Sequence, residues 1–220
     1  MTDEPLRFRD PTSLTAWTLR LLYGHVLVSA VAVGSGMLEY QLLTELDSGV
    51  AAAQDWTAAA EASDDRQGIV GLLQVAFFFA SGVLILMWIY RANDNAHRLG
   101  AAGMAFTPGW AVGWYFIPFA NLWKPYQAMK EIWRASASPM DPGSQAVPSL
   151  LPWWWFFWIA SNLFANATFR LALNAEELDE MIRANVLAQI ADAAEIPLGL
   201  LLIAIIRRVH EMQVSRARPM

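Results

Sequence analysis

The stretch IVGLLQVAFFFASGVLILMWIY, residues 69–90, carries no charged side chain over 22 positions. An α-helix rises about 1.5 Å per residue, so about 20 apolar residues cross the hydrocarbon core of a bilayer. The stretch therefore predicts a membrane-spanning helix. Mainly acidic residues precede it and basic residues follow it: Glu61, Asp64, Asp65 and Arg66, then Arg91 and Arg98.

Three further stretches have this length and composition, at about residues 21–43, 150–173 and 186–206. Their flanks alternate in sign in the same way. Lys and Arg are retained on the cytoplasmic side of a membrane. We therefore expect an all-α integral membrane protein with a four-helix transmembrane bundle over residues 17–207. The N-terminal segment 1–16 and the basic tail 208–220 should both be cytoplasmic.

Tryptophans support the same orientation, because they gather at the ends assigned to the cytoplasmic side. Interfacial belts of Trp and Tyr are typical of membrane proteins. The residues concerned are Trp17, Trp88, Trp153, Trp154 and Trp155.

Composition excludes several classes of function. The chain is 56% hydrophobic with a mean hydropathy of +0.32, well above soluble usage. It has no cysteine, which excludes disulfides, thiolate nucleophiles and cysteine metal sites. It shows no nucleophile elbow, paired-His zinc motif or phosphate-cradling loop. We expect no cofactor and no metal. Enzyme activity stays open only as an intramembrane enzyme, which would require a cavity joining Asp192 or Glu195 to a second polar group such as Arg170. The basic residues border the membrane and so favour anionic lipid headgroups over nucleic acid.

A fifth apolar stretch, GWAVGWYFIPFANLW at residues 109–123, is shorter and contains Pro118. If it crossed the membrane, Lys124, Lys130 and Arg134 would lie outside, against the charge rule. Proline prevents a continuous helix. Residues 108–135 are therefore interpreted as a re-entrant or interfacial segment that returns to the cytoplasmic face.

The end of this segment, residues 125–134, has the pattern of an amphipathic helix. Met129, Ile132 and Trp133 share one face, and Lys130 and Arg134 share another. Such a helix is expected in the inner membrane interface.

Two stretches, WIYRANDNAHRLG at 88–100 and FTPGWAVGWYFIPFANLWKPYQAMKEIWRAS at 106–136, carry a family resemblance. They resemble the bacterial membrane domains of unknown function of family number 4328. The resemblance implies a multispanning protein of a bacterial inner membrane, and it implies no activity.

The motif also gives candidate ligand-binding residues: Trp114, Tyr115, Asn121 and Lys124. One interpretation is architectural, because the Asn121 amide can satisfy carbonyls freed by the break at Pro118. The alternative is that broken half-helices line a binding site, as they do in transporters.

Polar residues inside the apolar stretches give the remaining candidates, because they are costly in a bilayer. Asn162, Asn166 and Arg170 recur at helical spacing in the third stretch. Asn185, Gln189, Asp192 and Glu195 do so in the fourth, and Glu39 lies in the first. We predict that Arg170 pairs with Glu39, Asp192 or Glu195. The cluster either fixes helix register or forms a polar cavity, open to the outside, for a ligand, ion or lipid headgroup.

Two other polar residues have simpler interpretations. His25 is expected to be a packed, hydrogen-bonded residue, and Gln74 to make one interhelical hydrogen bond.

The function expected from these observations is non-enzymatic. The chain should bind a small ligand, a lipid or a partner protein in sensing or assembly. The alternative is a small transporter or channel subunit. The expected partners are the bilayer, anionic headgroups on the cytoplasmic face, and a second copy of the chain or another membrane protein.

Overall fold

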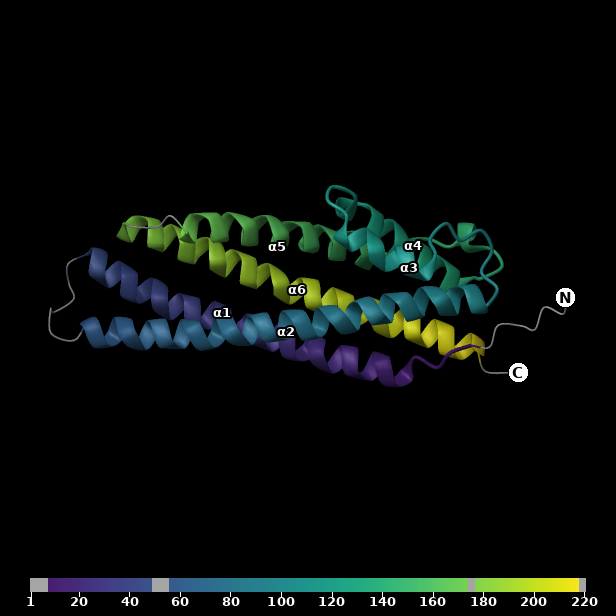
Figure 1. Cartoon of the computed structure of the whole chain (residues 1–220), viewed down its shortest axis with the longest axis horizontal. Helices are drawn as coiled ribbons and strands as arrows, with labels where there is room; N and C mark the ends of the chain where they lie inside the picture. Colours follow the sequence, from purple (N-terminus) through teal and green to yellow (C-terminus); the bar gives the residue numbers. More distant parts are fainter. Residues whose placement is uncertain (1–7, 49–55, 174–176, 218–220) are drawn as a thin grey trace. The chain divides into compact units, whose positions relative to one another are not determined.

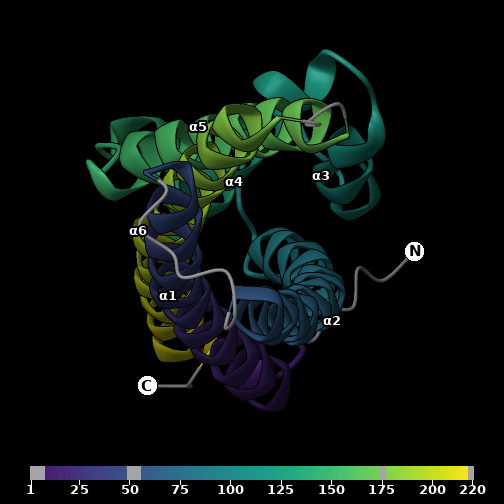
Figure 2. The same ribbon diagram turned by 90° about the vertical axis from the view of Figure 1, so that its left-hand side faces the viewer.

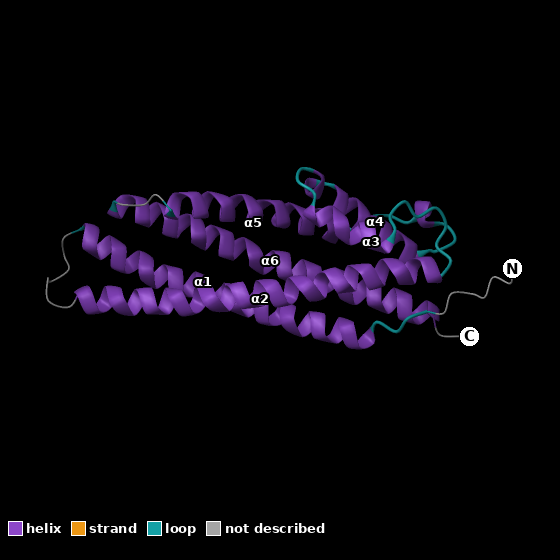
Figure 3. Ribbon diagram, in the orientation of Figure 1, coloured by secondary structure: helices purple, strands orange, loops and turns teal. Residues whose placement is uncertain are grey.

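The computed structural model describes residues 8–48, 56–173 and 177–217, and its elements in these ranges are all helical (Figure 3). The long helices are α1 (Thr12–Asp47), α2 (Trp56–Arg98), α5 (Leu150–Ala172) and α6 (Leu178–Ala217) (Figure 1). The short elements are α3 (Pro108–Gly113), η1 (Trp114–Phe116), η2 (Ala120–Leu122), α4 (Lys124–Ala137) and η3 (Pro142–Ser144). The outer parts of the expected terminal segments 1–16 and 208–220 lie outside the described residues.

Three of the described helices, α1, α2 and α6, are long and apolar enough to cross a membrane. By the length and composition of these helices, the chain can therefore span a membrane. The fourth expected span, α5, does not reach the same mean hydropathy, because it contains four tryptophans and two asparagines.

The chain divides into two compact units, and each long helix contributes residues to both. Unit 1 comprises residues 1–22, 80–155 and 201–220, and unit 2 comprises residues 23–79 and 156–200. The largest fully buried side chains of the described residues, Trp88 and Ile205 among them, all belong to unit 1. Two thirds of the large exposed apolar side chains belong to unit 2. Unit 1 therefore has a packed core, whereas unit 2 presents its apolar side chains outwards.

Charge divides between the units as well. By sequence, unit 1 holds 12 of the 15 Lys and Arg and 7 of the 20 Asp and Glu, and unit 2 holds the remaining 3 and 13. The alternation of sign along the chain therefore becomes one basic unit and one acidic unit.

The core of unit 1 corrects the interpretation of the tryptophans. Trp88 is 1% exposed, and its indole N–H donates to Oγ1 of Thr15 at 3.2 Å. The indole N–H of Trp155 donates to the carbonyl of Leu122 at 3.0 Å, and Trp154 is also buried. An interfacial belt is therefore wrong for these three residues, because they pack against protein. Trp17 and Trp153 are exposed.

Within unit 2, α1 lies against α6, as Figures 1 and 2 also show. Two glycines permit the close approach. A Cβ atom on Gly36 would lie 2.7 Å from Cγ of Gln189, and one on Gly199 would lie 2.5 Å from Cγ2 of Val26. Small residues let helix backbones approach closely in membrane proteins. The contact between α1 and α6 therefore depends on these glycines.

The helical path is interrupted around Pro118, as predicted. Helix α3 ends at Gly113, η1 follows it and ends at Phe116, and η2 starts at Ala120. Between them Phe119 has φ +64° and ψ −49°, and it is the non-glycine residue with positive φ in the described ranges. The segment is therefore not one continuous helix.

The amphipathic pattern of α4 is also confirmed. Met129, Ile132 and Trp133 are buried, and Lys130 and Arg134 are partly exposed. The buried face includes Ser136, whose Oγ accepts a hydrogen bond from Gln213 of α6 at 2.9 Å. The apolar face of α4 therefore packs on protein within unit 1 and is not free for lipid.

Candidate functional site

One face of α6 in unit 2 carries four polar residues: Asn185, Gln189, Asp192 and Glu195. Their spacing of four, three and three residues keeps them on one side of a helix. They extend over ten residues, which is about 15 Å along the helix axis. The partners of this polar stripe come from α1 and α2 of the same unit.

A hydrogen-bonded chain forms around Glu39 of α1. Its Oε2 accepts from Nε2 of Gln67 at 2.7 Å and from Nδ2 of Asn185 at 2.8 Å. Oδ1 of Asn185 in turn accepts from Nε2 of Gln189 at 2.6 Å. Nδ2 of Asn185 also donates to the carbonyl of Gly36 at 3.1 Å. Three helices therefore share one network of amides and a carboxylate.

The other two carboxylates of the stripe have separate partners. Oδ1 of Asp192 accepts from Nε2 of Gln74 in α2 at 2.7 Å. Oε2 of Glu195 accepts from Nε2 of His25 at 3.0 Å and from Oγ of Ser29 at 3.1 Å, both in α1.

These carboxylates accept hydrogen bonds from amides, a hydroxyl and an imidazole. Such donors satisfy the oxygen atoms, but amides and hydroxyls cancel no charge. A buried charge is expensive unless it is paired or neutralised. The arrangement therefore suits acceptance of a proton, a cation or a donor-bearing ligand.

A groove adjoins the network between α1 and α6. Its volume is about 310 Å³, and its lining residues are Val33, Met37, Tyr40, Val186, Gln189, Ile190 and Ala193. The polar side-chain groups among the lining residues are the Gln189 amide and the Tyr40 hydroxyl. Because Nε2 of Gln189 donates to Asn185, the amide oxygen of Gln189 is a group that can accept from a ligand.

The candidates on α5 make hydrogen bonds along their own helix. Nδ2 of Asn162 donates to the carbonyl of Trp158 at 2.7 Å, and Nδ2 of Asn166 donates to the carbonyl of Asn162 at 3.1 Å. Both side chains are exposed. These bonds explain how amides are accommodated on an exposed apolar helix. Arg170 is exposed, and its ion pair with a carboxylate stays a prediction.

The motif residues lie in unit 1. The Lys124 ammonium is 5.4 Å from the ring centroid of Trp114 and 5.7 Å from that of Phe106, so a cation–π contact joins two of the candidates. The hydroxyl of Tyr115 is buried and has no hydrogen-bond partner among the described residues.

Asn121 lies in η2, and the role predicted for its side-chain amide stays a prediction. Its backbone N–H donates to the carbonyl of Ile117 at 3.0 Å. The carbonyl of Ile117, next to Pro118, is therefore satisfied by the backbone.

Sequence reasoning left four partners out of the site: His25, Ser29, Gln67 and Gln74. The expectations of a hydrogen-bonded His25 and of one interhelical bond for Gln74 are confirmed. A signal was present, because His25 and Ser29 are four residues apart and Gln67 and Gln74 are seven apart. Both spacings align residues on one helical face.

Comparison with known proteins gives one family. The model of a family described as a domain of unknown function (DUF4328) matches residues 52–211. No curated protein and no solved structure matches the chain.

Proposed function

Since the chain belongs to the DUF4328 family, whose description assigns no activity, we propose a function from its own residues. It is a non-enzymatic, multispanning membrane protein that binds a membrane lipid between α1 and α6. The lipid carries a hydrogen-bond donor in its headgroup. Binding serves sensing or assembly.

The membrane arrangement in this proposal has four spans, with α5 as the fourth. Phe156, Leu163 and Phe169 are exposed along α5, as expected for side chains that face lipid. The basic composition of unit 1 and the acidic composition of unit 2 support cytoplasmic termini in an inner membrane. Phe116 and Phe119, exposed beside Pro118, support a re-entrant or interfacial segment.

The observation that carries the binding proposal is the position of Gln189 in the wall of the α1–α6 groove. The apolar wall suits an acyl chain, and the amide oxygen suits an N–H or O–H donor. Ligand sites commonly combine an apolar wall with a few fixed polar groups, in volumes of about 300–1,000 Å³. The groove, at about 310 Å³, lies at the small end of that range. Asn185 and Glu39 hold Gln189 in position.

Two lipids of matched chains test this proposal in nanodiscs. Phosphatidylethanolamine has ammonium donors, and phosphatidylcholine has none. We expect phosphatidylethanolamine to raise the melting temperature more. Gln189→Leu should remove the difference, and Ala193→Phe should weaken binding of both lipids by filling the groove.

Ala165→Phe is the matched control, because Ala165 is exposed on α5 and does not line the groove. Native mass spectrometry of the folded variants measures bound lipid directly. Equal binding of the two lipids by the original protein would refute the proposal, as would unchanged binding in Gln189→Leu and Ala193→Phe.

The polar stripe and its partners on α1 favour a second candidate, a small transporter or channel subunit. Together they place three carboxylates and an imidazole along the apolar parts of α1 and α6. Such chains of ionisable groups serve as proton relays in membranes. Proteoliposomes with a pH dye should then take up protons, and Glu195→Gln should abolish the uptake. Absence of flux in sealed vesicles would reject this candidate.

A further inference from the structure

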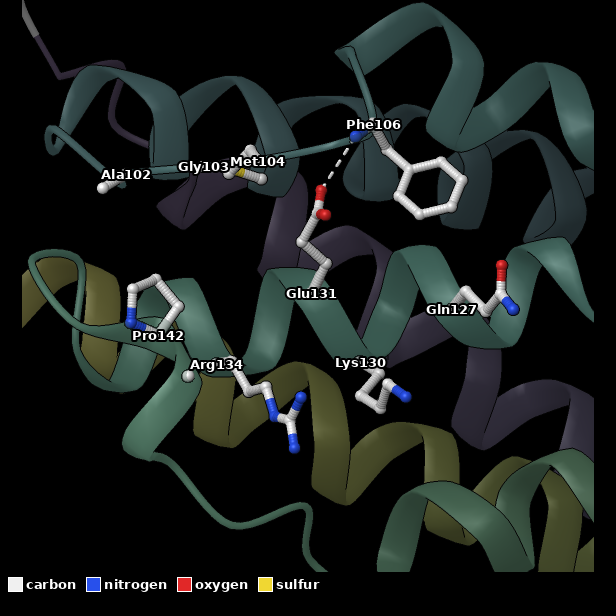
Figure 4. Close-up of a pocket in the computed structure, with 10 residues that line it drawn as sticks. Ala102, Gly103, Met104, Phe106, Gln127, Lys130, Glu131, Arg134 and Pro142 are labelled. Atoms are coloured by element: carbon white, nitrogen blue, oxygen red, sulfur yellow. Dashed lines mark hydrogen bonds between the residues drawn. The ribbon is translucent and has the colours of Figure 1, made fainter.

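A second cavity lies in unit 1, and it shares no lining residue with the groove between α1 and α6. Its volume is about 310 Å³, and it lies between the loop after α2 and one face of α4 (Figure 4). Helix α4 contributes Gln127, Lys130, Glu131 and Arg134. These residues recur at i, i+3, i+4 and i+7, which keeps them on one face. The opposite, apolar face of α4 is buried, so this orientation is fixed.

Glu131 holds the far wall of the cavity in place. One carboxylate oxygen accepts from the N–H of Ala105 at 2.8 Å, and the other accepts from the N–H of Phe106 at 3.0 Å. Figure 4 shows the carboxylate of Glu131 reaching from α4 to the backbone at Phe106. The second nearby carboxylate, Asp141, accepts from the N–H of Ser144 at 3.3 Å. Both oxygens of Glu131 and one oxygen of Asp141 therefore accept hydrogen bonds from backbone N–H groups.

The two cations that line the cavity, Lys130 and Arg134, retain N–H donors that a ligand can use. Arg134 uses Nε to donate to the carbonyl of Gln145 at 3.0 Å, and its two terminal nitrogens extend beyond that bond. The Lys130 ammonium lies 5.9 Å from the ring centroid of Tyr126. A cation–π contact of this kind uses no N–H donor in a conventional hydrogen bond. The Gln127 amide adds a neutral donor to the same wall.

We propose that this cavity binds a terminal phosphate group, either the phosphomonoester of a lipid headgroup or free inorganic phosphate. A guanidinium matches phosphate oxygens in a fork, and an ammonium adds a point charge. The excess of Lys and Arg over Asp and Glu in unit 1 strengthens the attraction. Glu131 acts as a positioning residue, because it fixes the loop that completes the wall.

The experiment compares phosphate sources on the full-length protein. Nanodiscs of phosphatidylcholine contain either phosphatidic acid or uncharged diacylglycerol, and a separate sample in neutral detergent receives inorganic phosphate. A higher melting temperature with both phosphate sources, or with phosphatidic acid alone, supports the proposal and identifies the source. If neither phosphatidic acid nor inorganic phosphate raises the melting temperature, the proposal is refuted.

Removing the two cations that line the cavity tests whether phosphate binds there. The double variant Lys130→Gln/Arg134→Gln should lower affinity at least about tenfold, because charge-assisted contacts are lost. The matched control Arg20→Gln/Arg208→Gln removes two cations of the same unit that do not line the cavity, and should keep the affinity within about twofold.

A second variant controls for a structural effect. Loss of the hydrogen bond from Arg134 to the carbonyl of Gln145 would also loosen the loop around Gln145. Lys130→Glu leaves that bond intact and places a carboxylate in the cavity, so it should also lower affinity. An equal loss in the control variant, or full affinity in folded Lys130→Glu, would overturn the assignment. If lipid binding between α1 and α6 is refuted, this result is unaffected, because the groove and the cavity share no lining residue.

Discussion

Nε2 of His25 lies 3.0 Å from Oε2 of Glu195 in unit 2, joining α1 to α6. Their side chains are 15% and 28% exposed, so the contact is largely shielded even before lipid surrounds the helices. The same carboxylate oxygen accepts from Oγ of Ser29. One carboxylate therefore fixes the axial position of α6 against two residues of α1.

Loss of this carboxylate should destabilise the protein. Glu195→Leu removes the acceptor from His25 and Ser29 and leaves partly buried donors without partners. We expect a loss of about 1–3 kcal/mol in the free energy of unfolding. Thermal or denaturant unfolding in detergent measures the change.

A double-mutant cycle distinguishes this contact from general packing. Glu195→Leu and His25→Phe should be non-additive by about 0.5–3 kcal/mol, as expected for residues in direct contact. Strict additivity would mean that the pair contributes no coupling.

The Gly36 position offers a prediction with a control in the same helix. Gly36→Ala places a Cβ 2.7 Å from Cγ of Gln189 and 3.3 Å from its Cδ. Gln189 must then move, and its bond to Asn185 is strained. We expect lower thermal stability and weaker preference for phosphatidylethanolamine over phosphatidylcholine.

Gly34→Ala is the control, because a Cβ atom added there would have nothing within 4 Å. Alanine is the better helix former by about 1 kcal/mol, so Gly34→Ala should be neutral or stabilising. If both variants show the same lipid preference, Gln189 does not determine the preference for phosphatidylethanolamine over phosphatidylcholine.

Much of the fold could be predicted from local pattern. The length of apolar runs predicts α1, α2 and α6, and Pro118 predicts the break before α4. The polar face of α6 was also visible, since Gln189, Asp192 and Glu195 follow helical spacing. Each of these features depends on residues close together in the sequence.

Partners across helices could not be predicted in this way, because spacing within one helix does not fix its rotation or axial offset against another. His25 lies four residues inside the expected span 21–43, near its N-terminal end, whereas Glu195 lies near the middle of the expected span 186–206. Their contact shows that the two spans are offset. Trp88 likewise matched an interfacial pattern, but its bond to Thr15 places it in a protein core.

The backbone at Phe119 predicts an unusual effect of glycine. A non-glycine residue at positive φ outside the common left-handed well costs about 1–3 kcal/mol. Phe119→Gly should therefore raise thermal stability in detergent. Phe119 is also 77% exposed, so the same change should weaken association of this segment with lipid.

Phe116→Gly is the matched control for Phe119→Gly. It removes an equally large side chain, 69% exposed, from a position with ordinary φ. It should weaken lipid association without a gain in stability. Destabilisation by Phe119→Gly would show that the strained backbone does not persist in solution.

The absence of native cysteine makes the four-span arrangement directly testable. We expect Ser48→Cys, at the end of α1, to react with a membrane-impermeant maleimide added to intact cells, because acidic flanks face outwards. Ser144→Cys, in η3 after the basic α4, should react only after the membrane is permeabilised. Both positions are exposed, so burial would not explain a missing signal. Labelling of Ser144→Cys from outside would mean that the segment around Pro118 crosses the membrane, and that the chain spans it five times.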